Sequence, residues 1–156
     1  MTTITALDLQ TLLATAGAQG RRRQNLNLHA DLSDPIQRLL NALLPGTYVC
    51  PHRHEAGIWE SFTILSGHAV VLTFADGGRV LSRVDLNAES AVITEIPGGV
   101  CHSILALTPA VVFEIKPGPY RPATAKDFAA WAPPEGTPQA PALVAWMERA
   151  QIGEVF

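Results

Sequence analysis

Between residues 47 and 116 the sequence breaks into short runs rich in β-branched and aromatic residues, and this pattern most restricts the folds open to the chain. The runs are TYVC, WESFTIL, AVVLTF, GRVLSRVDL, SAVITEI, HSILAL and AVVFEIK. Turn residues lie between them, including Gly67, PGG at 97–99 and TPA at 108–110, and FADGGRV has the pattern of a tight hairpin. Short strands joined in this way predict a mostly β fold built around a small antiparallel β-barrel rather than a parallel sheet.

Helices are expected on both sides of these strands. Near the N-terminus, apolar residues recur at near-helical spacing up to Gly17, and they are Leu7, Leu9, Leu12 and Leu13. This spacing indicates a short amphipathic helix. A last amphipathic helix is expected at about residues 142–151.

A further helix is predicted over residues 34–43, in the segment DPIQRLLNALLPG. Asp34 can cap its N-terminus, and Pro35 fits the first turn. The apolar face of this helix would consist of Ile36, Leu39, Leu40 and Leu43. Pro45 and Gly46 would end it.

The length and composition favour a single domain. A chain of 156 residues with 47% apolar and 16% charged residues can build one core but not two ordinary domains. We therefore expect one domain over residues 1–156, with an N-terminal helical segment at about 1–45 and the barrel at about 46–118. A proline-rich strap followed by the last helix would occupy about 119–156.

Charge and hydropathy exclude several functional classes. A net charge of −3 and a sequence pI near 5.9 give no electrostatic footprint for nucleic acid, and Arg21, Arg22 and Arg23 are interpreted as a solvated turn, with an anion contact as the alternative. No apolar run is long enough for a membrane span, and the N-terminal stretch, interrupted by Asp8, does not have the pattern of a signal peptide. With only two cysteines, reduced thiols are expected, so we predict a cytoplasmic protein.

The segment PHRHEAGIWE at 51–60 predicts a metal site. Alternate side chains of an extended strand point to the same face, so His52 and His54 should converge. Glu60 shares a face with Phe62 and Ile64, which places its carboxylate in the barrel interior. A buried carboxylate costs several kcal/mol unless it is paired or bound to a cation, so a metal ion between it and the histidines is expected.

A third imidazole comes from IPGGVCHSILAL, in which a turn leads into a strand that begins at His102. An antiparallel barrel brings strands that are distant in sequence side by side. We therefore predict His52, His54, Glu60 and His102 as ligands of one divalent transition metal, without distinguishing Fe, Mn, Ni and Zn.

These residues resemble the two motifs of the cupin superfamily. The segment from Gly46 to Gly67 is similar to the first motif, although its gap from His54 to Glu60 is one residue longer than usual. PGGVCH at 97–102 is similar to the core of the second motif, although Ala91 and Ala106 stand where a leading Gly and a trailing Asn are customary. The resemblance implies a small antiparallel barrel of the jelly-roll type with the metal inside.

A narrower resemblance covers about residues 21–136 and is to the WbuC family of cupin-fold metalloproteins. It rests on RRRQNLNLHADLSDPIQRLLNALLPGTYVCPHRH, WESFTILSG, PGGVCH and FEIKPGPYRPATAKDFAAWAPPEG. The last segment is not a general cupin feature, so it makes the match specific. The resemblance implies a bacterial protein, and some members of the family are associated with surface-polysaccharide gene clusters.

The predicted function is therefore that of a mononuclear metal-binding cupin with a small-molecule partner. Four protein ligands on an octahedral ion leave two positions for a bidentate carbohydrate-derived or hydroxy/carboxylate ligand, where the metal would act as a Lewis acid. The alternatives are a non-catalytic sensor or binding cupin, an iron-dependent dioxygenase and a metal-free sugar epimerase, and the complete ligand set argues against the last. The sequence decides neither whether the protein is an enzyme nor whether it forms a homodimer.

Five other residues are candidates for lesser roles. Cys50 should share the strand face of His52, and a small buried hydrophobe is favoured over a metal-bound sulfur. His29 is a candidate for the rim of the site. Glu114 and Lys116 are expected to pair on one strand face, with substrate contact as the alternative, and Tyr120 to close over the barrel mouth.

Overall fold

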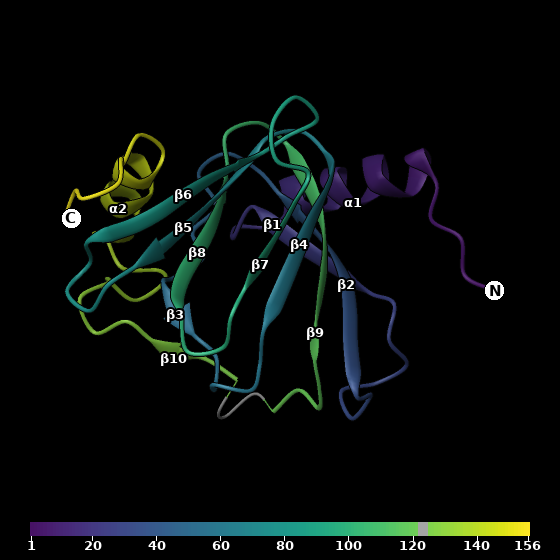
Figure 1. Ribbon diagram of the computed structural model, residues 1–156. Helices are drawn as coiled ribbons and strands as arrows, with labels where there is room; N and C mark the ends of the chain where they lie inside the picture. The colour runs from purple at the N-terminus through teal and green to yellow at the C-terminus, as the bar shows by residue number, and fades with distance from the viewer. Residues whose placement is uncertain (122–124) are drawn as a thin grey trace.

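The protein consists of two antiparallel β-sheets and two helices, shown in Figure 1 as a computed structural model that describes residues 1–121 and 125–156. Sheet A has the strand order β1 (Arg23–Asn27), β2 (Ile36–Leu43), β9 (Ala110–Pro117), β4 (Glu60–Ser66) and β7 (Ile93–Ile96). Sheet B has the order β10 (Asp127–Phe128), β3 (His52–Arg53), β8 (Cys101–Ala106), β5 (Ala69–Phe74) and β6 (Val80–Leu86). Every strand pair within the two sheets is antiparallel.

One apolar core joins the two sheets. Phe62 of β4 and Val112 of β9 belong to sheet A, and they share a buried cluster with Val71, Leu86 and Ile104 of sheet B. The two sheets therefore pack face to face, as expected for a sandwich of antiparallel strands. This arrangement confirms the mostly β, antiparallel prediction and the hairpin between β5 and β6.

Each sheet is also covered on its outer face by a helix. Helix α1 (Ala6–Ala18) packs Leu12 and Ala16 against sheet A, where the facing residues are Leu40, Ala42 and Val111. Helix α2 (Ala140–Met147) packs against sheet B through Leu143, Val144 and Met147, opposite Val70, Leu72 and Leu105. Both predicted terminal helices are confirmed, α2 with its start two residues earlier than expected.

The predicted helix over residues 34–43 is wrong, because Ile36–Leu43 forms strand β2 between β1 and β9. Leu40 and Ala42 face α1, whereas Leu39 and Leu43 face the space between the sheets. With apolar residues on both faces, the alternation of a strand is hidden in the sequence, and the leucines take on a helical spacing by coincidence. Tertiary packing therefore overrides the local pattern. The expected helical segment at about 1–45 is helical only over α1.

The edge of sheet B also differs from the prediction. The strand expected over TYVC is wrong, because residues 47–50 form no strand, whereas the extended segment expected at His52 forms β3 and pairs with both β8 and β10. The strap expected from about residue 119 contributes β10 to sheet B, and its residues 122–124 lie outside the described part of the chain. Among the described residues, no helix has the length and apolarity to cross a membrane.

Candidate metal centre

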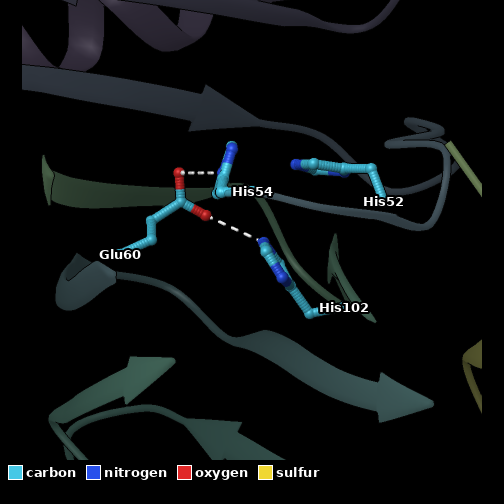
Figure 2. Close-up of side chains that lie close together, drawn as sticks. All are labelled: His52, His54, Glu60 and His102. Atoms are coloured by element: carbon cyan, nitrogen blue, oxygen red, sulfur yellow. Dashed lines mark hydrogen bonds and ion pairs between the residues drawn. The ribbon is translucent and has the colours of Figure 1, made fainter. Parts of the chain in front are cut away.

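The four predicted ligands meet between the two sheets, as Figure 2 shows. His52 of β3 lies directly opposite His102 of β8 in sheet B, and His54 follows the end of β3. Glu60 is the first residue of β4 in sheet A and reaches them from the facing layer. All four side chains are at least 95% buried, and their potential ligand atoms lie within 4.8 Å of one another.

Backbone contacts fix the orientation of the three imidazoles. Each Nδ1 lies at hydrogen-bond distance from a carbonyl oxygen: His52 from Cys50 at 2.9 Å, His54 from Ala125 at 2.6 Å and His102 from Val100 at 2.9 Å. Because a carbonyl oxygen only accepts, Nδ1 carries the proton in each ring. An Nε2 atom without a proton then presents its lone pair to the centre of the cluster, which is the arrangement that metal-binding histidines need.

The same Nε2 atoms have few partners within the protein. Those of His52 and His54 are buried and have no hydrogen-bond partner in residues 1–121 and 125–156. His54 Nε2 is 3.4 Å from Glu60 Oε1, a contact that counts as an ion pair only if the ring is protonated. A buried polar atom without a partner costs about 1–3 kcal/mol. A divalent cation would satisfy these nitrogens together with the carboxylate, so the donor set fits a metal ion.

The spacing of the donors also suits a single ion. Two ligands on opposite sides of an ion lie about 4.2 Å apart when each bond is about 2.1 Å long. The 4.8 Å spread is close to this limit, so small side-chain movements would place all four donors on one ion. Imidazole nitrogen with one carboxylate oxygen is a donor set accepted by zinc, iron, manganese and nickel.

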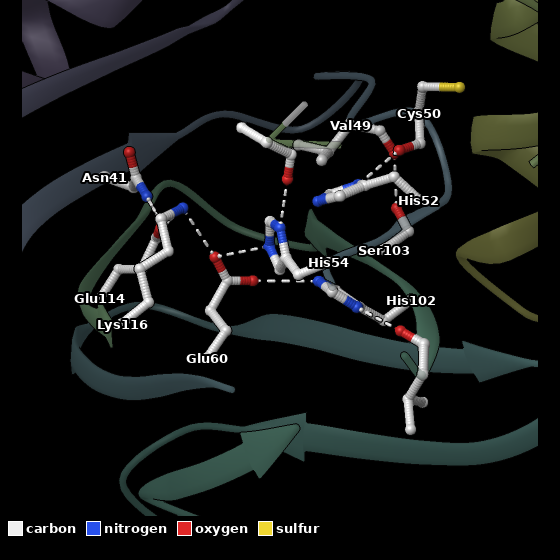
Figure 3. Close-up of polar contacts among 12 residues, drawn as sticks. Asn41, Val49, Cys50, His52, His54, Glu60, His102, Ser103, Glu114 and Lys116 are labelled. Carbon is white, nitrogen blue, oxygen red and sulfur yellow. Dashed lines mark hydrogen bonds and ion pairs between the residues drawn. The ribbon is translucent and has the colours of Figure 1, made fainter. Parts of the chain in front are cut away.

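Glu60 is the acidic end of a buried chain of charges, shown in Figure 3. Lys116 Nζ donates to Glu60 Oε1 at 3.0 Å and to Glu114 Oε1 at 2.5 Å, which confirms the predicted pairing of Glu114 with Lys116. Asn41 donates its amide to the other oxygen of Glu114. Glu60 Oε2 therefore remains for the metal side of the site, where it lies 2.9 Å from His102 Nε2.

These contacts set the charge state of each group. Burial acts to raise the pKa of Glu60, but the charge of Lys116 and the contacts with the His102 and His54 rings outweigh it and hold the pKa well below its usual range. Burial and the charge of Glu60 raise the pKa of Glu114 to about 7. Burial acts to lower the pKa of Lys116, but the two carboxylates raise it on balance, so Lys116 stays charged.

His52 is held neutral. Burial, followed by the positive charge of Lys126 and the neighbouring His102 ring, lowers the pKa of His52 to about 2. A neutral imidazole is the form that binds a metal, so protons do not compete for this nitrogen near neutral pH.

A cavity of about 380 Å³ adjoins the cluster and includes His52, Glu60 and His102 in its wall. Its volume lies in the range of about 300–1,000 Å³ that is typical of small-molecule sites. His29 and Tyr120 also line it, and the Tyr120 ring centre is 5.9 Å from Lys116 Nζ. The structure thus places both of these candidate residues at the cavity.

Cys50 does not join the cluster. Its side chain packs in the core under α2, and Figure 3 shows its sulfur directed away from the His52 ring. This packing fits the favoured interpretation of Cys50 as a small buried hydrophobe. Arg21 and Arg23 bind the carboxylate of Glu135, so the anion contact considered for this basic run is one within the chain.

Sequence reasoning missed a second set of cavity residues. Lys126 and the inward-facing residues of β1, namely Arg23, Asn25 and Asn27, line the same cavity as the predicted ligands. The signal for the β1 residues was present in RQNLNLH, where polar residues alternate with others at a period of two. Lys126 had no such signal, because it is brought to the site by the strap.

Gly98 positions the loop that carries His54. A Cβ atom at Gly98 would lie 2.3 Å from the carbonyl oxygen of Ala56, and the neighbouring Gly99 N–H donates to the His54 carbonyl. Gly98→Ala is therefore expected to displace this loop and to weaken metal binding by about tenfold or more, as a shifted support does in other metal sites. Gly57→Ala is the matched control, since a Cβ atom there meets nothing within 4 Å. Metal affinity by chelator competition checks the pair, and equal affinities would contradict a positioning role for Gly98.

Comparison with protein families gives one match. A family model described as "Domain of unknown function (DUF6016)" matches residues 4–86, a little over half of the chain. No curated protein matches the sequence significantly.

Solved structures of similar fold include sugar-related proteins. The capsular polysaccharide assembling protein CapF from Staphylococcus aureus matches with 20% identity and a TM-score of 0.54, over 67% of this chain but only 31% of CapF. L-ribose isomerase from Cellulomonas parahominis, solved with L-psicose, matches with 16% identity and a TM-score of 0.55, over 70% of each chain. At these identities the matches show the fold alone. A cupin superfamily protein from Desulfitobacterium hafniense also matches, with 22% identity over 60% of this chain and 77% of that one, and a TM-score of 0.46.

Proposed function

The chain belongs to the family described as "Domain of unknown function (DUF6016)", and from its site we propose that it is a mononuclear metal-binding cupin that takes a small carbohydrate-derived or hydroxycarboxylate ligand. The observation that carries the proposal is the convergence of three Nε2 lone pairs and one ionised carboxylate in a buried site beside a cavity. We propose His52, His54, Glu60 and His102 as the ligands.

The site has the features of a reactive centre rather than of a structural one. Structural zinc sites have four protein ligands, which usually include cysteine, whereas the donors here are histidine and glutamate at the wall of a cavity. When bound, a divalent metal supplies a Lewis acid that polarises an oxygen atom of the ligand.

Glu114 is our candidate for a proton carrier beside the metal. It is buried, its pKa is raised to about 7, and it lies in the wall of the same cavity. A carboxyl group with such a pKa can hold or release a proton near neutral pH, which general acid–base catalysis requires. Lys116 donates hydrogen bonds to both Glu114 and Glu60, and its positive charge offsets the repulsion between these two buried carboxylates.

The carbohydrate link is supported by the neighbours in fold. CapF is described as a capsular polysaccharide assembling protein, and the isomerase was solved with a ketose. Together with the resemblance to the WbuC family, this supports a ligand derived from bacterial surface polysaccharide. The WbuC assignment stays a prediction from sequence.

Elemental analysis of protein purified without added metal or an affinity tag tests the proposal. About one equivalent of a divalent transition metal is expected for a four-ligand mononuclear site. A protein that neither retains such a metal nor binds one on titration would contradict it.

The cobalt-substituted protein tests whether the site is open. Four protein ligands leave room on an ion that takes more than four, so we expect a five- or six-coordinate spectrum of low intensity. Addition of azide or a small hydroxy acid should change that spectrum. An intense tetrahedral spectrum that millimolar ligand does not alter would instead indicate a closed, structural metal.

A further inference from the structure

Strand β1 supplies a polar wall to the cavity. A strand normally packs apolar residues on the side that faces a core. Arg23, Asn25 and Asn27 face the cavity, and His29 continues this row beyond the end of the strand. Leu26 lies on the opposite face and is 38% exposed. A strand with this pattern does not gain its stability from the cavity side, so the polar row calls for another explanation.

His29 ends the row with an unused donor. Its side chain is 93% buried, and the Arg38 backbone N–H donates to its Nδ1 at 3.1 Å. The carbonyl of Arg38 already accepts from the N–H of Leu28. If Nδ1 of His29 accepts from the Arg38 N–H, both backbone groups of Arg38 therefore have a partner. Nε2 then carries the proton, and it has no partner in the described parts of the chain.

Lys126 supplies a positive charge to the same cavity. Of the basic residues in the wall, Arg21 and Arg23 bind Glu135, and Lys116 binds Glu60 and Glu114. Lys126 has no ion pair with any residue that the structure describes. Lys126 lies near the metal cluster, because it lines the same cavity as His52, Glu60 and His102. An unpaired cation in the cavity of a chain with a net charge of −3 favours an anionic ligand.

From this juxtaposition we propose that the cavity binds a polyhydroxylated carboxylate, with its carboxylate between the metal and Lys126 and its hydroxyl groups along Asn25, Asn27 and His29. The inference rests on the proposed metal centre and names the ligand class and the residues that recognise it. A carboxylate pairs with an ammonium group through a charge-assisted hydrogen bond, and amide and imidazole donors match hydroxyl oxygens.

Three probes separate the two ends of such a ligand in calorimetric titrations of the metal-loaded protein. Gluconate carries both ends, sorbitol lacks the carboxylate, and glycolate lacks the hydroxylated chain. Gluconate is expected to bind at least about tenfold more tightly than either of the others, since each end contributes hydrogen bonds. Equal affinities for gluconate and sorbitol would overturn the proposal.

Variants of the protein identify which residues bind the carboxylate end of the ligand and which bind its hydroxylated end. Lys126→Gln should weaken gluconate by about tenfold or more and leave sorbitol unchanged, whereas Lys126→Arg should retain most of the affinity. Asn27→Ala and His29→Phe should weaken gluconate and sorbitol but not glycolate. Asn27 is exposed, so its variant still tests the row if His29→Phe fails to fold. A Lys126→Gln protein with an unchanged preference for gluconate over sorbitol would overturn the assignment of the carboxylate.

The metal content of every sample is measured alongside the titrations. A wild-type protein that takes up no metal contradicts the proposed function, whereas the preference for gluconate and its dependence on Lys126 still decide the ligand class. A metal-loaded protein without that preference contradicts the ligand class alone.

Discussion

The His54→Ala protein is expected to lose nearly all of its bound metal and to keep its fold. His54 contributes one of four converging donors, and it lies beyond the end of β3 and outside the apolar clusters that hold the sheets together. Loss of a residue that only supports a metal ligand weakens metal binding by about 10–100-fold, so removal of a ligand should exceed about 100-fold. Elemental analysis and chelator competition measure the loss, and circular dichroism tests the fold.

His68→Ala is the matched control for this change. His68 is half-buried, pairs with Asp85 at 2.8 Å and stands outside the cluster, so its loss should leave the metal content unchanged. Full metal occupancy in a folded His54→Ala protein would remove His54 from the site.

Metal affinity is expected to rise steeply with pH, because binding must displace protons. A metal can bind His52, His54 and His102 only where Nε2 carries no proton, so protons compete with the metal as the pH falls through the region near 6.5 where free histidine titrates. Each proton that binding displaces changes the affinity about tenfold per pH unit.

Glu114 adds to this dependence, whereas His52 does not. The pKa of Glu114 is raised to about 7 by burial and by the negative charge of Glu60, and a cation bound to Glu60 would offset that charge and lower the pKa. Near pH 7 the metal should therefore also displace part of the Glu114 proton. His52, with a pKa of about 2, stays neutral throughout this range. Chelator competition across pH and calorimetry in buffers of different ionisation enthalpy measure the protons released. An affinity that does not change from pH 8 to pH 5 is incompatible with this site.

The sequence predicted the strands of the central region well because their turns are explicit. Gly67 illustrates the point, since its φ of +78° is one that glycine adopts readily, and it joins β4 to β5 as the turn pattern indicated. Strand β2 could not be recognised in the same way. Its burial depends on α1 on one side and on the opposite sheet on the other, and neither partner is visible in a local window.

The four proposed ligands could be predicted for a related reason. His52 and His54 are separated by one residue, so strand geometry alone brings them to one side, and the inward direction of Glu60 follows from Phe62. The residues proposed to recognise the ligand could not be predicted in this way. Lys126 directly precedes β10 and Asn27 ends β1, and the positions of these two edge strands are set by long-range pairing. No spacing in the sequence encodes that pairing.

The two faces of β2 have an evolutionary consequence. Leu40 and Ala42 hold α1 on the outer side, whereas Asn41 faces the cavity. Exchange of an amide on the inner side leaves the apolar contacts with α1 in place. Natural variants of this fold can therefore diverge in the molecule they bind while they keep the packing that lets them fold, and selection can act on the two properties almost independently.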